Sequence, residues 1–278
     1  MRSKLMKIIL IFLGVLYVLY VGFPFYWLFL TSIKPKTELF ILPIKWWPSK
    51  FEWYNYISVW KSFPLSRYFL NSIMVTTLTV ILAVTISSSA AYALSRIRFK
   101  GNNTIITLLL ITQMLPGIVT LVPFYFWMMN LGLLNTYWGL ILAYSTWSIP
   151  FCTLMLRGYF KTACPQELEE AALIDGCTRF SAYYRIALPL SVPGLVAGGA
   201  FSFMLAWKEF MWASIMISSG ALKTLPVGLY DMIGEGGNIN FLTEFMTASV
   251  LTCIPVLVVF FVFQSYIVGG LTQGAIKG

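Results

Sequence analysis

Six apolar stretches, each long enough to cross a bilayer, constrain this chain more than any other feature of its sequence. A hydrocarbon core about 30 Å thick needs roughly 20 apolar residues of helix. Lipid offers no hydrogen-bond partner to a free backbone group, so such stretches must be helices, whereas barrel strands would be shorter and would alternate in polarity. We therefore predict one all-α, polytopic transmembrane domain over residues 1–278. The stretches lie at approximately residues 8–30, 68–94, 104–129, 137–156, 194–218 and 245–267.

Composition and charge agree with a membrane protein and argue against a nucleic-acid partner. Hydrophobic residues make up 59% of the chain and charged residues only 10%. The net charge is +9, yet no Lys/Arg-rich run is present that could hold a nucleic acid. In a membrane protein such an excess is typical of loops that face an anionic leaflet.

The N-terminus reads MRSKLMK and is followed by an apolar run from Ile8 to about Leu30. A cleaved signal peptide would have a shorter apolar core and a small-residue cleavage site. Aromatic residues, which favour the membrane interface, lie instead at the far end of the run. We expect a retained first membrane helix.

The distribution of Lys and Arg predicts the orientation, because loops rich in them stay cytoplasmic. With the N-terminus inside, the cytoplasmic side holds eleven basic residues and the opposite side seven. The bias is modest, and the loop between the first two helices opposes it. Compact basic clusters at the N-terminus and at residues 96–100 favour the N-inside arrangement. Six helices then return the C-terminus to the cytoplasm.

Nothing in the sequence supports catalysis or metal binding. Histidine is absent, and Cys152, Cys164, Cys177 and Cys253 lack C-x-x-C spacing. Neither a zinc site nor a Cys–His nucleophile pair can be assembled, so a membrane enzyme is not favoured. We predict a non-catalytic chain with no metal site.

Proline and glycine interrupt several of the apolar stretches. Pro116, Gly117 and Pro123 lie in the third, Pro150 in the fourth and Pro255 in the sixth. Proline removes a backbone donor and kinks a helix, and kinked helices open space within transporters.

Small residues at a spacing of four predict close helix packing in two places. Gly194 and Gly198 open the fifth stretch, and Ser87 and Ala91 lie in the second. Such pairs let helix backbones approach each other, either within the chain or against another chain.

The loop of residues 34–64, which the orientation places outside, is rich in Trp, Tyr and Pro. Such rings suit the membrane interface. The loop is interpreted either as a lid on the bilayer surface or as a docking site for an external partner.

Charge collects in the cytoplasmic segment of residues 158–192. Eight of the 29 charged residues fall between Arg157 and Arg185. Pro165 and the acids that follow it are typical of a helix N-terminus, and Gly176 is typical of a C-terminus. A second short helix is expected from about residue 179 to residue 187. The segment is therefore predicted to form a helix–turn–helix elbow.

The spacing within this elbow resembles the EAA signature of ATP-binding-cassette importer permeases. The residues that match are Glu170, Ala171, Ala172, Gly176, Ile186, Leu188 and Pro189. Residues 67–72, 91–101 and 270–278 further resemble the carbohydrate-uptake branch, specifically the maltose-permease G-subunit type. The resemblance extends over nearly the whole chain.

This resemblance implies a type I importer permease fold and a place in the prokaryotic inner membrane. It also implies a function, half of the translocation path of an ATP-driven oligosaccharide importer. The implied partners are a second permease subunit, two copies of an ATPase subunit, an extracytoplasmic solute-binding protein and the sugar itself. ATP and Mg would bind the ATPase subunits, and this chain indeed lacks G-x-x-x-x-G-K-[ST].

In the family the elbow is a coupling helix that docks in a groove of the ATPase. Gly176 would supply the corner of this lever, Ala171 and Ala172 a close approach, and Glu170 a charge to pair. The coupling residues expected from the resemblance are Glu170, Ala171, Ala172, Asp175, Gly176, Ile186, Leu188 and Pro189.

The fifth stretch carries ionisable residues inside a predicted span, where they are costly and usually face a cavity or a partner. The family often has asparagine where this chain has Lys208. The cluster is interpreted equally as a sugar contact or as a gate or subunit-interface ion pair. The candidate path residues are Trp207, Lys208, Glu209, Trp212 and, in the third stretch, Gln113.

Two further segments have roles that the resemblance implies. The loop of residues 220–243 would face the solute-binding protein, and residues 273–278 would reach between the ATPases. Two alternatives stay open: a permease for another solute, such as a polyol or glycerol phosphate, and an ion-coupled secondary transporter. The second would usually have more helices and an internal repeat.

Overall fold

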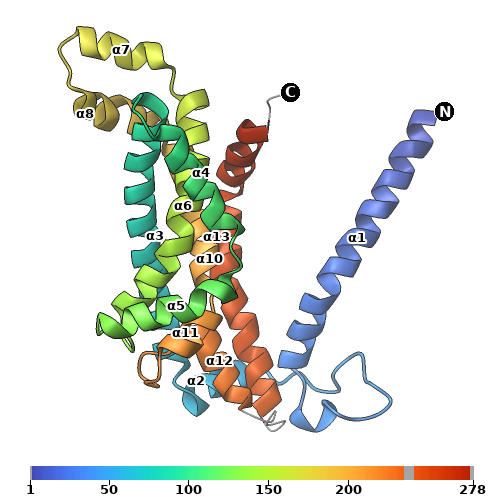
Figure 1. Cartoon of the computed structure of the whole chain (residues 1–278). Helices are drawn as coiled ribbons and strands as arrows, with labels where there is room; N and C mark the ends of the chain where they lie inside the picture. Colours follow the sequence, from blue (N-terminus) through green and yellow to red (C-terminus); the bar gives the residue numbers. More distant parts are fainter. Residues whose placement is uncertain (1, 235–240, 276–278) are drawn as a thin grey trace. The chain divides into compact units, whose positions relative to one another are not determined.

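A computed structural model describes residues 2–234 and 241–275 of the chain, and every regular element in these two ranges is a helix (Figure 1). The chain divides into two compact units. Unit 1 comprises residues 1–66 and 228–254, and unit 2 comprises residues 67–227 and 255–278. The principal helices are α1 (Arg2–Ser32), α2 (Asn55–Ser62), α3 (Leu65–Arg96), α4 (Asn102–Met114), α5 (Gly117–Asn130), α6 (Tyr137–Ala163), α7 (Gln166–Ile174), α8 (Arg179–Ala182), α9 (Leu188–Leu190), α10 (Val192–Trp207), α11 (Met211–Met216), α12 (Leu225–Ile233) and α13 (Leu242–Ala275).

Four of the described helices are long and apolar enough to cross a membrane: Met6–Ser32, Leu65–Arg96, Tyr137–Thr162 and Leu242–Tyr266. Two helix pairs, each bent sharply at a short break, bring the number to six if each pair counts as one span. The all-helical, polytopic fold predicted from the apolar stretches is therefore confirmed, with four to six candidate spans.

The third apolar stretch, predicted at residues 104–129, forms two helices instead of one kinked helix. The axes of α4 and α5 differ by 103°. Leu115 is extended, with ψ of 127°, and Pro116 follows with ψ of 130°. A residue before proline avoids the helical region because of the clash with the proline ring. The Pro116-Gly117 pair thus ends one helix and starts the next, whereas Pro123 is accommodated inside α5.

The fifth stretch, predicted at residues 194–218, is also broken. Helix α10 ends at Trp207, and α11 begins only at Met211. Lys208 and Glu209 therefore lie in a non-helical gap between two helices, which a pattern of apolar residues alone does not reveal.

Within unit 1, the loop that follows α1 is held by polar contacts to the end of that helix. The Lys34 ammonium lies 4.5 Å from the centre of the Trp27 ring and donates to the Lys45 carbonyl at 2.6 Å. Burial lowers the pKa of Lys34. Ser49 donates from its hydroxyl and its backbone N–H to the Glu38 carboxylate, which holds the pKa of Glu38 below its usual value.

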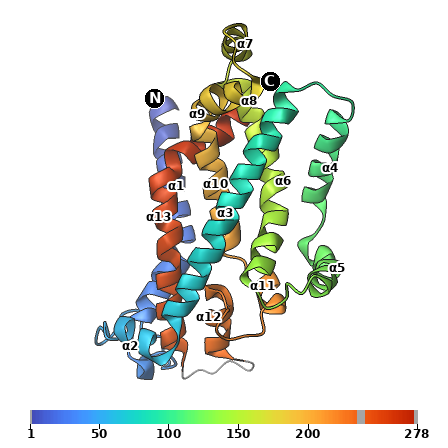
Figure 2. The ribbon, with the colours of Figure 1, turned by 90° about the vertical axis from the view of Figure 1, so that its left-hand side faces the viewer.

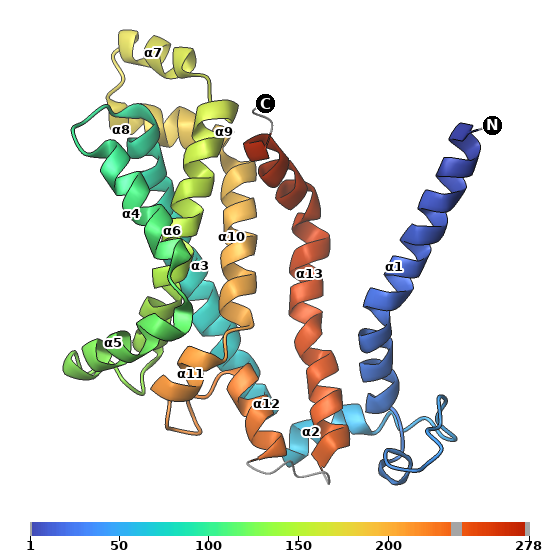
Figure 3. The ribbon, with the colours of Figure 1, turned by 45° about the vertical axis from the view of Figure 1, so that its right-hand side comes forward.

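Within unit 2, α3, α6 and α10 run alongside one another, with α7 and α8 at one end and α5 and α11 at the other (Figures 2 and 3). The core around α6 and α11 is apolar and includes Leu140, Tyr144 and Met216. A second apolar cluster, with Tyr92, Leu156 and Phe160, lies beneath the elbow. The elbow is thus attached to a packed end of the bundle.

The small residues predicted to pack closely do so within the chain. A Cβ atom added at Gly194 would lie 2.6 Å from the Tyr159 ring, and one at Gly198 would lie 3.6 Å from the Cys152 sulfur. Ser87 donates to the Ile149 carbonyl at 3.0 Å, and Ala91 is fully buried.

Replacing Gly194 with alanine is expected to lower the stability of unit 2. The added methyl group would overlap the buried Tyr159 ring, and overpacking of this kind costs about 1–3 kcal/mol. Thermal unfolding of the detergent-solubilised protein measures the effect. Gly220→Ala is the matched control, because no atom lies within 4 Å of its added Cβ. Equal melting temperatures for the two variants would contradict the predicted overlap.

Candidate functional site

In the structure the elbow comprises residues 166–190, and its first helix is α7. Pro165 precedes it, and Glu167 and Glu169 lie in its first turn, where the helix dipole favours acidic side chains. Its C-terminus is closed by two backbone bonds, from Gly176 N–H to the Leu173 carbonyl (3.2 Å) and from Cys177 N–H to the Ala172 carbonyl (2.9 Å). This pattern is the Schellman motif.

Gly176 makes the turn possible. Its φ is +89°, a left-handed conformation that residues with a Cβ rarely adopt. A Cβ built there would meet no atom within 4 Å, so the requirement for glycine comes from the backbone conformation and not from a lack of space. Asp175 precedes it as the C-cap of α7.

The second arm of the elbow starts at Thr178, whose hydroxyl accepts a hydrogen bond from Ser181 N–H at 3.2 Å. The arm continues through α8, a π-helical turn at Tyr183–Ala187 and α9. Ile186 and Leu188 are half-buried on it, whereas Pro189 is exposed. The arm makes an angle of 74° with α10, so the chain turns sharply from the elbow into the bundle.

A buried polar network attaches the elbow to α3 and α6. Arg96 Nε donates to Glu169 Oε1 at 2.8 Å, and the two side chains are each only 6% exposed. Tyr92 donates its hydroxyl hydrogen to Glu169 Oε2 at 2.8 Å. Arg96 Nη2 also donates to the carbonyls of Phe160 (2.9 Å) and Cys164 (2.5 Å) at the end of α6. A carboxylate and a guanidinium that are buried together are thus both hydrogen-bonded.

Glu169, and not its neighbour Glu170, is therefore the acid that anchors α7. The EAA signature drew attention to Glu170, which is exposed and accepts a hydrogen bond from Gln166 at 3.0 Å. Ala171 is exposed and Ala172 is buried. The sequence offered one signal for Glu169: residues three apart lie on the same face of a helix, so Glu169 shares its face with the small residue Ala172.

Large apolar side chains on the elbow are strongly exposed. Ile174 is 86% exposed and Phe180 76%, on either side of the Gly176 corner. Tyr184 and Leu168 add to this apolar surface, at 63% and 48% exposed. Exposed apolar groups of this size outside the lipid-facing helices are typical of a protein–protein contact. We name these four residues the elbow patch.

Near the opposite end of unit 2, the gap between α10 and α11 borders a cavity of about 340 Å³. The Glu209 carboxylate accepts hydrogen bonds from the N–H groups of Trp212 (2.9 Å) and Ala213 (3.2 Å), the first turn of α11. We name this space the polar cavity after its two charged residues, Lys208 and Glu209, although most of its lining residues are aliphatic or aromatic. Its lining residues are Tyr144, Trp147, Leu205, Ala206, Lys208, Glu209, Phe210, Met211 and Trp212.

Three of the five candidate path residues thus lie together, and two do not. Lys208, Glu209 and Trp212 line the polar cavity. Trp207 is buried at 2% exposure and stacks on Phe203, so it belongs to the core. Gln113, in α4, is not among the lining residues. The structure adds Tyr144 and Trp147 from α6, which sequence spacing could not connect to α10.

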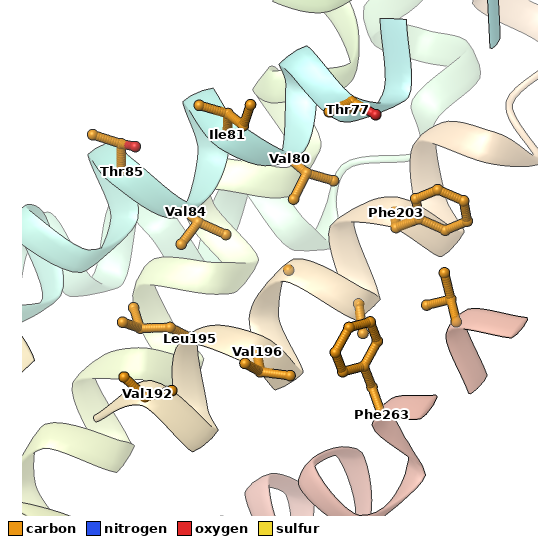
Figure 4. Close-up of a pocket in the computed structure, with 13 residues that line it drawn as sticks. Thr77, Val80, Ile81, Val84, Thr85, Val192, Leu195, Val196, Phe203 and Phe263 are labelled. Atoms are coloured by element: carbon orange, nitrogen blue, oxygen red, sulfur yellow. The ribbon is translucent and has the colours of Figure 1, made fainter. Parts of the chain in front are cut away.

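A larger groove of about 550 Å³ in unit 2 has no charged residue among those that line it. Figure 4 shows its lining: Val80, Ile81 and Val84 from α3, Leu195 and Val196 from α10, and Phe263 from α13. Thr77 and Thr85 are the only hydroxyl-bearing residues among those that line it. A solute with many hydroxyl groups needs hydrogen-bond partners in a binding site, so the polar cavity is the better candidate for a sugar contact.

Two predicted segments lie partly outside the described residues. In the loop of residues 220–243, Asp231 and Gly234 are described, and residues 235–240 are outside the described ranges. Of the C-terminal segment 273–278, the backbone is described only to residue 275. The partner contacts expected of both segments stay predictions.

The chain is similar to known proteins over most of its length. Residues 83–273 match the family model described as binding-protein-dependent transport system inner membrane component. The chain is 38% identical to the probable ABC transporter permease protein YurM of Bacillus subtilis, over 95% of this chain and 86% of that protein. It is 36% identical to the trehalose/maltose transport permease protein MalG of Thermococcus litoralis, over the full length of both.

A further relative is the sulfoquinovosyl glycerol transport permease protein SmoH of Agrobacterium fabrum, 39% identical over 92% of this chain and 89% of that protein. Among solved structures, a bacterial ABC transporter involved in the import of the acidic polysaccharide alginate has the same fold. Its TM-score is 0.83 at 22% identity, over 95% of this chain and 97% of that one. The chain therefore belongs to the family of inner-membrane components of binding-protein-dependent transport systems, the permease subunits of ABC importers.

Proposed function

We propose that this chain is one permease subunit of an ATP-driven carbohydrate importer and that its elbow receives force from a separate ATPase. Relatives whose names specify trehalose/maltose and sulfoquinovosyl glycerol transport support carbohydrate as the solute class. The whole chain acts as one permease domain, with both termini in the cytoplasm. A second permease subunit completes the translocation path, two ATPase copies hold ATP and Mg, and a solute-binding protein delivers the sugar.

The observation that carries this proposal is an exposed apolar patch on an elbow that is anchored to the bundle. The elbow patch is the surface that an ATPase groove would cover, with Glu170 and Ala171 exposed on α7. The Arg96–Glu169 pair connects the same elbow to α3 and α6. Movement of a docked ATPase would thus be transmitted to membrane-spanning helices instead of being lost in a mobile loop.

Replacing Phe180 with aspartate is expected to weaken ATPase binding about ten- to a hundred-fold. Burying a phenylalanine side chain contributes about 1.5–3 kcal/mol, and each 1.4 kcal/mol is a ten-fold change in affinity. Affinity capture of the ATPase by the tagged, solubilised chain measures the effect, together with ATP-dependent uptake into proteoliposomes. Phe180 is 76% exposed, so the folded chain itself should be little affected.

The matched control is Phe99→Asp, which changes an exposed phenylalanine in the loop after α3, outside the elbow patch. It should leave ATPase capture at the wild-type level. Full ATPase capture by the Phe180→Asp variant would refute docking at the elbow patch. Uptake that persisted without any ATPase would refute the ATP-driven importer itself and favour an ion-coupled transporter.

A further inference from the structure

We propose that Lys208 makes the polar cavity selective for saccharides that carry an anionic group, such as a carboxylate, sulfonate or phosphate. This inference rests on the proposed function, because it assigns a substrate class to the same importer. The two neighbouring ionisable residues, Lys208 and Glu209, have different contacts.

The Glu209 charge is held by the backbone. Its two carboxylate oxygens accept separate hydrogen bonds, one from Trp212 N–H and one from Ala213 N–H. The Tyr144 hydroxyl lies close enough to Glu209 to interact with it. These contacts stabilise the negative charge of Glu209 and orient its carboxylate towards the start of α11. Glu209 therefore caps α11, and the Lys208 charge has no counter-ion among the described residues.

Lys208 has the opposite environment. It is the C-cap residue of α10, its side chain is exposed, and the structure gives it no hydrogen bond or ion pair among the described residues. It is also the one basic side chain among the described residues that line the polar cavity. The 16 residues of α10 extend roughly 24 Å, which places Lys208 at the far end of a helix that starts at the elbow.

A cation without a counter-ion is costly within a membrane-spanning segment. A lysine near the middle of a span costs about 2.5–3.5 kcal/mol on insertion scales, so intramembrane cations usually face a cavity or a partner. Here Lys208 lines a cavity whose volume of about 340 Å³ lies within the range of small-molecule sites. An anionic group on the passing solute would supply the missing negative charge at each transport event.

The other lining residues fit the rest of a saccharide. Trp147, which is half-buried, presents aromatic surface, which packs on the apolar faces of sugar rings. Glu209, which is half-buried, offers carboxylate oxygen atoms to hydroxyl groups. A neutral sugar would use these contacts but would leave Lys208 uncompensated, so the site discriminates against it.

The test compares two disaccharides that differ in one group, cellobiose and its uronic acid, cellobiouronate. Uptake of each is measured in proteoliposomes that contain the complete importer and its solute-binding protein. Wild type should import cellobiouronate about ten-fold or more faster than cellobiose. Lys208→Asn should remove this preference, and Lys208→Arg, which keeps the charge, should retain most of it. Lys100→Asn, an exposed lysine in the loop after α3 and outside the polar cavity, is the matched control.

Three outcomes would overturn the proposal. The first is a wild-type importer that prefers cellobiose or takes neither probe. The second is a Lys208→Asn variant with the wild-type ratio of the two rates. The third is loss of the second permease subunit on purification of Lys208→Asn, because the lysine would then pair with that subunit. Each leaves the proposed function standing as long as ATP still drives uptake of another sugar, which keeps the two failures distinguishable.

Discussion

Replacing Gly176 with proline is expected to lower solute uptake more than about a hundred-fold while the chain still inserts in the membrane. Proline requires φ near −65°, whereas Gly176 has φ of +89°, and proline would also remove the N–H that donates to Leu173. It further disfavours the conformation of Asp175, the residue before it, whose ψ of 5° is far from the extended values that a residue before proline prefers. A cost of about 3 kcal/mol or more corresponds to a factor above one hundred. The corner of the elbow would open and the ATPase could no longer move the bundle.

A milder substitution at the same position distinguishes the loss of the turn geometry from a general loss of stability. Gly176→Ala retains the N–H group but places a Cβ at positive φ, at a cost of about 1–2 kcal/mol. It should lower uptake about five- to thirty-fold. Gly158→Ala in α6 is the control, because its backbone is helical and no atom lies within 4 Å of the added Cβ. Wild-type uptake by the Gly176→Pro variant would show that the elbow is not the lever.

Replacing Arg96 with alanine is expected to lower the free energy of unfolding by about 3–5 kcal/mol and to abolish coupling. Removing one partner of a buried ion pair leaves the other charge uncompensated, and that is the main cost. Glu169 would keep only Tyr92 and Cys164 as donors. The carbonyls of Phe160 and Cys164 would lose the Arg96 Nη2 donor as well. Thermal unfolding in detergent and ATP-dependent uptake measure the two effects.

Arg98→Ala is the matched control, since Arg98 is exposed two residues further along the chain. It should change stability by less than about 0.5 kcal/mol. Adding Glu169→Gln to the Arg96→Ala variant should recover part of the lost stability, because the uncompensated charge is then removed. If Arg96→Ala unfolds at the same temperature as Arg98→Ala, the buried pair does not hold the elbow.

Several features of the fold could be predicted from the sequence because they depend on neighbours along the chain. Long apolar stretches must become helices in lipid, whatever they pack against. The helix that covers Glu170 to Ala172 and its end at Gly176 follow from local capping chemistry, in which every hydrogen bond spans five residues or fewer. The coupling role of these residues remains a prediction from the family resemblance.

The breaks in the third and fifth stretches were harder to predict, although their residues are visible in the sequence. Pro116 predicts a kink, but the size of the turn, 103°, depends on how α4 and α5 pack. At Lys208 and Glu209 no proline or glycine marks the gap, and it exists because the Glu209 carboxylate replaces backbone partners at the start of α11.

The sequence by itself determined the class of this protein: helices that span a membrane, a charged elbow, and a corner that only glycine adopts without strain. Only the tertiary structure decided which acid anchors the elbow, because Arg96 and Glu169 are separated by 73 positions and meet only when α3, α6 and α7 pack together. It likewise brought Tyr144 and Trp147 to Lys208 and Glu209 around one cavity. The physical reason is the range of the forces: helix formation and capping act over one or two turns, whereas burial and ion pairing act between segments that the sequence does not place side by side.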